Sequence, residues 1–152
     1  MILCLVFPTI CVSQLLTGKV ISIKDGDTIE ILVEGKPVKI RLFGIDCPEK
    51  KQDFGKVAMQ YTSDQCFNQL VRVKSFGKDQ FKRILGDVIL PDDRNLNQEL
   101  VRNGLAWRYK HSKNAYLLEL QQEAARKQKG LWVQKNPVPP WEWRGEHKRQ
   151  KK

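Results

Sequence analysis

The sequence predicts an α+β protein in which five β-strands form a closed sheet and three helices pack beside it. Apolar and polar side chains alternate between residues 19 and 45, which is the period of β-strands, and many of the apolar ones are β-branched. Two further strand-like runs and three runs with helical spacing follow. A chain of 152 residues is the size of one ordinary domain, so a second full core is excluded.

The first three strands are expected to form an antiparallel meander. Residues 20–23, 28–33 and 38–45 each show the alternation, and the segments between them carry the Gly, Asp and Pro residues that turns require. In the third run, Arg41 lies on the opposite face from Ile40 and Leu42, so its side chain should leave the core.

The rest of the chain mixes helices with two more strands. Helical spacing predicts helices over residues 54–68, about 95–103 and about 114–129, whereas residues 71–76 and 83–90 show strand character. Asn95 suits the start of the second helix and Gly104 its end. An open five-stranded sheet would leave exposed edges, so we expect an OB-type β-barrel with three helices.

Composition and charge narrow the choice of partner. Lys and Arg number 27 against 17 Asp and Glu, which gives a net charge of +10 and favours a polyanion over an acidic partner. Hydrophobic residues make up 41% of the chain, which excludes wholesale disorder.

The two ends of the chain differ from its middle. Residues 1–17 begin with an apolar run that is too short to span a membrane and is typical of a signal peptide or other targeting segment, with small residues at Cys11 and Ser13 before a cleavage site. We therefore expect a secreted or periplasmic protein; a retained membrane anchor or a first strand are the alternatives. Residues 18–133 are expected to form the domain, and residues 134–152 a tail rich in Pro, Trp and basic residues, whose KRQKK end at residues 148–152 should be mobile.

The four cysteines lack the C-x-x-C spacing of a structural zinc site. Removal of a signal peptide would leave Cys47 and Cys66. The two could form a disulfide in an oxidising compartment, or they could be a loop thiol and a small core residue. The sequence leaves both alternatives open.

Acidic and basic residues gather at the ends of the predicted strands. Asp27 opens the second strand and Asp46 follows the third, so the meander could bring two carboxylates together near Arg41. Oxygen ligands favour calcium or magnesium over zinc or copper, and arginines pair with phosphate. Taken alone, each of these motifs is also compatible with a turn or a solvated strand charge.

Such a set of residues suits hydrolysis of a phosphodiester. The reaction requires neutralisation of the charge on the transition state, a positioned water and a proton for the leaving oxygen. A divalent cation acts as a Lewis acid on one phosphate oxygen, and permanently charged guanidinium groups pair with the others.

Four segments, in order and spacing, resemble the staphylococcal nuclease (thermonuclease) family over about residues 18–133: DGDT at 25–28, RLFGIDCPE at 41–49, DQFKR at 79–83 and QELVRNGLA at 98–106. The resemblance implies an OB-type barrel with three helices. It also implies calcium-dependent cleavage of DNA and RNA at the 5′ P–O bond, leaving 3′-phosphates. We expect a monomer with nucleic acid as its partner and no stable protein partner.

The resemblance also assigns roles to residues of this chain. Asp27 and Asp46 match the family's calcium carboxylates, and Cys47 would add its backbone carbonyl as a third ligand. Glu49 matches the carboxylate assigned as general base. The remaining matches are the phosphate-binding arginines Arg41 and Arg83 and the aromatics lining the nucleotide pocket, Trp107 and Tyr109; Trp107 is alternatively a core residue.

Two departures from the family pattern affect the site. Cys47 stands where Thr or Ala is common, and Phe81-Lys82 stands where Tyr-Gly often precedes the second arginine. The first change keeps the carbonyl, and the second removes backbone freedom and a hydroxyl group.

Two other functions remain open. One is a nucleic-acid-binding module without catalysis, although the acids and arginines that such a module would lack are present here. The other is a lipid-surface protein, which would use the apolar start and the basic end of the chain.

Overall fold

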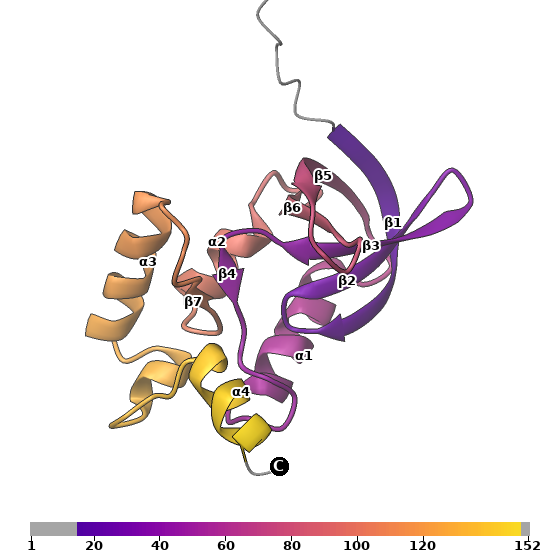
Figure 1. Cartoon of the computed structure of the whole chain (residues 1–152). Coiled ribbons are helices and arrows are strands. Elements are labelled where there is room, and N and C mark those ends of the chain that lie inside the picture. Colours follow the sequence, from indigo (N-terminus) through magenta and orange to yellow (C-terminus); the bar gives the residue numbers. More distant parts are fainter. Residues whose placement is uncertain (1–14, 150–152) are drawn as a thin grey trace, which may run out of the picture.

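The computed structural model describes residues 15–149. Five strands form a closed barrel in the order β1-β2-β3-β6-β5, so the predicted OB-type barrel is confirmed (Figure 1). The strands of the barrel are β1 (Leu15–Asp25), β2 (Thr28–Val33), β3 (Lys36–Leu42), β5 (Leu70–Lys78) and β6 (Ile84–Ile89). Within the described residues, no helix is both long and apolar enough to cross a membrane.

The barrel closes through one parallel pairing. β1, β2 and β3 form the expected antiparallel meander, and β5 pairs antiparallel with both β1 and β6. β3 and β6 run parallel, with Ile40 opposite Ile84. β1 begins at Leu15, earlier than predicted, and its first residues pair with β5. The predicted targeting segment otherwise lies outside the described residues and stays a prediction.

The third predicted strand is interrupted. We expected one strand over residues 38–45, but β3 ends at Leu42 and the chain turns at Gly44, whose φ of 77° is in the left-handed region. β4 (Ile45–Asp46) then pairs outside the barrel with β7 (Trp107–Arg108). The prediction was wrong because apolar residues continue through Ile45, so the sequence pattern gives no sign of the turn. The turn places Asp46 in this second, two-stranded sheet beside the barrel.

The core follows the predicted alternation along the strands. Ile29 and Ile31 of β2, Ile40 and Leu42 of β3 and Val73 of β5 are fully buried. Arg41 lies between Ile40 and Leu42 and points away from the core, as expected. Burying each of these side chains contributes about 1.5–3 kcal/mol to the free energy of folding. The core therefore stabilises the strands that carry the polar residues.

Three helices lie where the sequence predicted them: α1 (Gly55–Cys66), α2 (Leu96–Arg102) and α3 (Ala115–Arg126). The side chain of Asn95 caps α2 by accepting a hydrogen bond from the N–H of Gln98 at 3.3 Å, and Asn114 caps α3 in the same way. Gly104 follows α2 with a φ of 66°, as its predicted role as a stop requires.

The C-terminal part of the chain contains helices that the sequence did not predict. A short 3₁₀ helix η1 (Gly130–Val133) leads to a fourth helix, α4 (Pro140–Arg149). Residues 150–152 of the end predicted to be mobile lie outside the described residues. α4 lies beside the chain segment that follows β4 (Figure 1). The rings of Trp107 and Tyr109 contact Trp141 edge to face, with centroids 5.9 and 6.3 Å apart. These contacts hold α4 against the segment that contains β7.

Among residues 15–149, Cys47 and Cys66 are buried and free, so the structure favours two separate thiols over a disulfide. Cys66 donates a hydrogen bond from its thiol to the carbonyl of Thr62 within α1. Burial raises the pKa of the Cys66 thiol to about 12, which makes it unreactive.

Candidate active site

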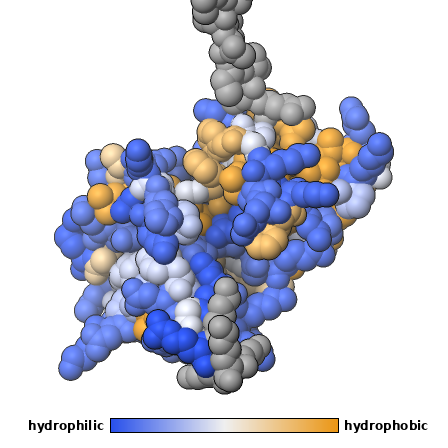
Figure 2. Space-filling view, viewed as in Figure 1, coloured by the Kyte–Doolittle hydropathy of each residue, from blue (hydrophilic) through white to orange (hydrophobic). Residues whose placement is uncertain are grey.

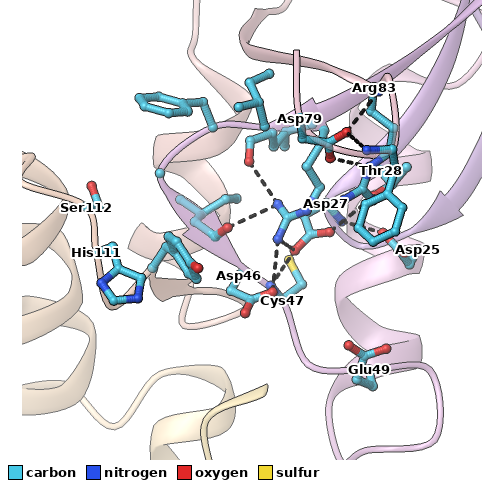
Figure 3. Close-up of a pocket in the computed structure, with 18 of the residues that line it drawn as sticks. Asp25, Asp27, Thr28, Asp46, Cys47, Glu49, Asp79, Arg83, His111 and Ser112 are labelled. Atoms are coloured by element: carbon cyan, nitrogen blue, oxygen red, sulfur yellow. Dashed lines mark hydrogen bonds and ion pairs between the residues drawn. The ribbon is translucent and has the colours of Figure 1, made fainter. Parts of the chain in front are cut away.

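A pocket of about 980 Å³ opens beside the barrel where the β1–β2 turn, the end of β3, the loop before β6 and α4 meet (Figure 3). The side chains that line it are mostly polar, whereas hydrophobic surface gathers over the barrel in Figure 2. Five carboxylates and three guanidinium groups line the pocket. They are Asp25, Asp27, Asp46, Glu49, Asp79, Arg41, Arg83 and Arg144.

The two carboxylates predicted to bind metal share one arginine. Arg41 Nη2 lies 3.1 Å from Asp27 Oδ2 and 2.9 Å from Asp46 Oδ1. The barrel positions this group because Arg41 and Thr28 are register partners on β3 and β2, which brings the turn before β2 next to the end of β3. Both carboxylates are buried.

Arg41 also fixes the turn that carries Asp46. Its Nη1 donates to the carbonyls of Leu42 at 2.8 Å and Ile45 at 3.0 Å, the residues on either side of the Phe43–Gly44 turn. The terminal Nη atoms are therefore engaged within the protein, and Nε remains as the donor that can reach a ligand without breaking these contacts. Arg41 thus supplies positive charge and holds the two acids in place.

Asp27 is buried among charged groups of both signs. Burial raises the pKa of Asp27 to about 7, and the nearby Asp25 and Asp46 carboxylates add to the shift, while Arg41 and the N–H of Cys47 oppose it. The Cys47 N–H donates to Asp27 Oδ2 at 2.6 Å. Buried acids that repel one another in this way gain free energy when a cation joins them.

The residues present fit a hard cation. Asp27 and Asp46 offer carboxylate oxygens, and Cys47, which follows Asp46 in the chain, offers its backbone carbonyl. No group of three or more His, Cys, Asp or Glu side chains among residues 15–149 is arranged to hold an ion. Calcium accepts backbone carbonyls and waters as ligands besides carboxylates, so a two-carboxylate set with these additions suits it.

Arg83 is held by its own loop. Asp79 Oδ2 accepts from Arg83 Nε at 2.8 Å, and Asp79 Oδ1 accepts from the backbone N–H groups of Phe81 and Arg83. Because Nε makes this contact, the terminal nitrogens are turned to the pocket, where Nη1 lies 3.5 Å from Thr28 Oγ1. Lys82 adopts a φ of 62°, the conformation that the family's glycine would favour, and the loop closes without it.

Glu49 lies at the outer side of the pocket (Figure 3). Its backbone N–H donates to Gln52 Oε1 at 3.1 Å, which fixes the start of the loop before α1. Its side chain is 37% exposed, so solvent reaches the carboxylate. A carboxylate that is anchored by its backbone and open to water can accept a proton from that water.

Sequence reasoning missed Arg144, on α4. Its Nη2 lies 2.7 Å from Asp46 Oδ2, and its Nη1 lies 2.7 Å from Glu49 Oε1. Although desolvation opposes it, hydrogen bonding to both acids raises the pKa of Arg144. The signal in the sequence was Pro139-Pro140 followed by WEWR, because proline is favoured in the first turn of a helix.

The two predicted aromatic residues are placed differently. Tyr109 and His111 line the pocket, with ring centroids 5.4 Å apart. Trp107 does not line it; its ring packs against Trp132 at a centroid distance of 4.4 Å and against Trp141. This placement favours the alternative that Trp107 is a packing residue.

Comparisons with known proteins agree with this geometry. A family model described as "Staphylococcal nuclease homologue" matches residues 39–134. An "Uncharacterized endonuclease" of Escherichia coli is 42% identical over 139 residues, which cover 91% of this chain and 90% of that protein. A "Micrococcal nuclease" of Shigella flexneri is 38% identical over 138 residues, covering 84% of this chain and 79% of that protein.

Proposed function

Since the chain belongs to the family of staphylococcal nuclease homologues, we propose that it is a calcium-dependent endonuclease that hydrolyses DNA and RNA at the 5′ P–O bond and leaves 3′-phosphates. One observation carries the proposal: Asp27, Asp46, Glu49, Arg41 and Arg83 all line one pocket. A non-catalytic binding module would have no need to retain this set.

Arg83 is the arginine best placed to bind the scissile phosphate. Its terminal nitrogens face the pocket while Asp79 holds Nε, so the guanidinium is oriented before substrate arrives. A fixed guanidinium stabilises the extra negative charge of the transition state without reorganising. Arg41, on the neighbouring strand β3, supports it through its charge and its free Nε.

Asp27, Asp46 and the carbonyl of Cys47 are the residues that would hold calcium. When bound there, the ion supplies Lewis-acid polarisation of a phosphate oxygen. The role of the protein is to keep the two carboxylates buried and close together, which Arg41 and the Cys47 N–H do in this structure.

Glu49 is the group that would take a proton from the attacking water. Its carboxylate is exposed to solvent on the same side of the pocket as Asp46. A general base at this position is worth about 10² to 10⁴ in rate. Release of its partner Arg144 would leave the carboxylate free for this role.

Cleavage of both DNA and RNA fits the polar and aromatic lining of the pocket. Charged groups contact phosphates, which the two nucleic acids share, and a ring such as that of Tyr109 stacks on any base. The net charge of +10 attracts the polyanion, so binding is expected to weaken steeply with salt. We also propose that the protein is exported, on the basis of its apolar N-terminal sequence.

The test is release of acid-soluble nucleotides from single-stranded DNA and from RNA, in calcium and in chelator. We expect cleavage with calcium and none with chelator. The 3′ ends of the products should be open to end-labelling only after phosphatase has removed their 3′-phosphates. Glu49→Gln serves as the catalytic control and Arg126→Gln, on the far helix α3, as the control for lost surface charge. Binding without cleavage under all conditions would favour the non-catalytic module.

A further inference from the structure

Arg144 places a guanidinium group against two carboxylates of the pocket. It comes from α4, whereas Asp46 and Glu49 lie almost a hundred residues earlier in the chain. The guanidinium covers both oxygens of Asp46: Nη2 is 2.7 Å from Oδ2 and Nη1 is 3.3 Å from Oδ1. The same Nη1 is 2.7 Å from Glu49 Oε1.

These contacts nearly saturate Asp46. A carboxylate offers about four acceptor positions, and here Arg144 uses two of them while Arg41 uses a third at 2.9 Å. A calcium ion that binds Asp46 needs one or two of its oxygens and would also stand close to a guanidinium of the same charge. Arg144 and a cation therefore compete for the same oxygens.

The charges that line the pocket agree with an exchange of Arg144 for a divalent cation. Five carboxylates and three guanidiniums leave an excess of two negative charges with Arg144 seated. Withdrawal of Arg144 would raise the excess to three, which increases the attraction for a divalent ion. Arg144 in this position thus reduces the negative charge that attracts calcium, and it also neutralises Glu49.

α4 does not depend on Arg144 alone for its place. Trp141 packs against Trp107 and Tyr109, and Pro139 and Pro140 are buried. The carbonyl of Val138 accepts a hydrogen bond from Gln52 Nε2 at 2.6 Å. The helix can stay docked while the Arg144 side chain, which is 39% exposed, swings toward solvent.

We propose that Arg144 is an internal counter-ion of the site, which holds Asp46 and Glu49 in the metal-free enzyme and releases Asp46 when calcium binds. The inference rests on the proposed calcium site. Because coupling between two binding events is reciprocal, calcium weakens the contact of Arg144 by the same factor by which Arg144 weakens the binding of calcium.

The test is calcium affinity measured by isothermal titration calorimetry, without substrate. Arg144→Met removes the charge and the fork but keeps much of the side-chain length. A partly exposed ion pair is worth up to about 1 kcal/mol, so this variant should bind calcium about three- to fivefold more tightly than the wild type. Arg149→Met, on the same helix and outside the pocket, is the matched control and should change the affinity less than twofold.

A charge-conserving variant separates two effects of Arg144: its contacts with the Asp46 oxygens and its positive charge. Arg144→Lys keeps the charge but cannot fork across both oxygens of Asp46, so it should also bind calcium more tightly than the wild type, though less than Arg144→Met. An affinity equal to that of the wild type in both variants overturns the proposal. So does a large loss of activity in Arg144→Met at saturating calcium, which would make Arg144 a substrate contact.

Asp46→Asn distinguishes failure of this inference from failure of the proposed function. If Asp46→Asn loses calcium and Arg144→Met binds it like the wild type, the counter-ion role is wrong and the calcium site stands. If neither the wild type nor Arg144→Met binds calcium, the proposed calcium dependence fails and the counter-ion role fails with it.

Discussion

Asn97 offers a prediction that links the barrel to the site. This residue of α2 is fully buried, and its side chain joins three segments. Its Oδ1 accepts from the N–H of Val88 at 3.1 Å, and its Nδ2 donates to the carbonyls of Phe43 at 3.0 Å and Gly86 at 3.1 Å and to Asp87 Oδ1. Phe43 begins the turn that carries Asp46, so Asn97 holds that turn against β6.

Asn97→Ala is expected to destabilise the protein by about 3–5 kcal/mol. The side-chain amide accepts one hydrogen bond and shares two N–H protons among three acceptors, so about three hydrogen bonds are lost at about 1 kcal/mol each, and backbone groups that remain buried without a partner add to the cost. Asn95→Ala is the matched control, because it removes a single capping bond in the same helix and should cost about 1 kcal/mol.

The measurement is urea unfolding followed by circular dichroism, in chelator so that no ion contributes. The expected loss for Asn97→Ala is a large share of the 5–15 kcal/mol that an ordinary domain possesses. A cost for Asn97→Ala no greater than that for Asn95→Ala would refute the reasoning, since it would show that the contacts of Asn97 stabilise the protein no more than one capping bond does.

Three further predictions concern the site and the thiols. Glu49→Gln should lower kcat by about 10² to 10⁴ while binding of an oligonucleotide in chelator changes little, and equal losses in both would contradict its role as a base. Because the fold raises the pKa of Asp27 to about 7, the metal-free protein should lose stability as pH rises from about 4 to 7. Asp27→Asn should remove this loss, so the stability of the variant relative to the wild type in urea unfolding should grow with pH. A relative stability that falls as pH rises would contradict the shift. Since Cys47 and Cys66 are buried with raised pKa values, iodoacetamide followed by peptide mass analysis should label neither in the native state and both in urea; native labelling of either would contradict the burial.

The barrel could be predicted because its signal is local. Alternation along β2 and β3 and turn residues between them identify the meander, and the same alternation shows that Arg41 leaves the core. Closure through the parallel pairing of β3 with β6 joins residues far apart in the chain, so it could be inferred only from the need to cover sheet edges.

Part of the site could also be predicted from local sequence pattern. Asp27, Asp46 and Glu49 lie at or just beyond strand ends, where the meander brings them together. The β3–β4 turn was missed because Gly44 does not interrupt the apolar pattern.

Arg144 and α4 could not be predicted from local pattern. The segment has low helix propensity and many charges, and it is ordered by Trp141 packing on Trp107 and by ion pairs with Asp46 and Glu49. These contacts exist only once the barrel has formed. The placement of Trp107 outside the pocket has the same origin, because its partners Trp132 and Trp141 come from the last part of the chain.

A double-mutant cycle on the rate of DNA cleavage tests most directly whether the gathered residues act as one catalytic unit. Glu49→Gln and Arg83→Lys are compared singly and together, in saturating calcium. If both residues stabilise the same transition state in the same pocket, the double variant loses clearly less activity than the product of the two single losses. Losses that multiply fully would mean that Glu49 and Arg83 act independently, contrary to the single site described by the structure.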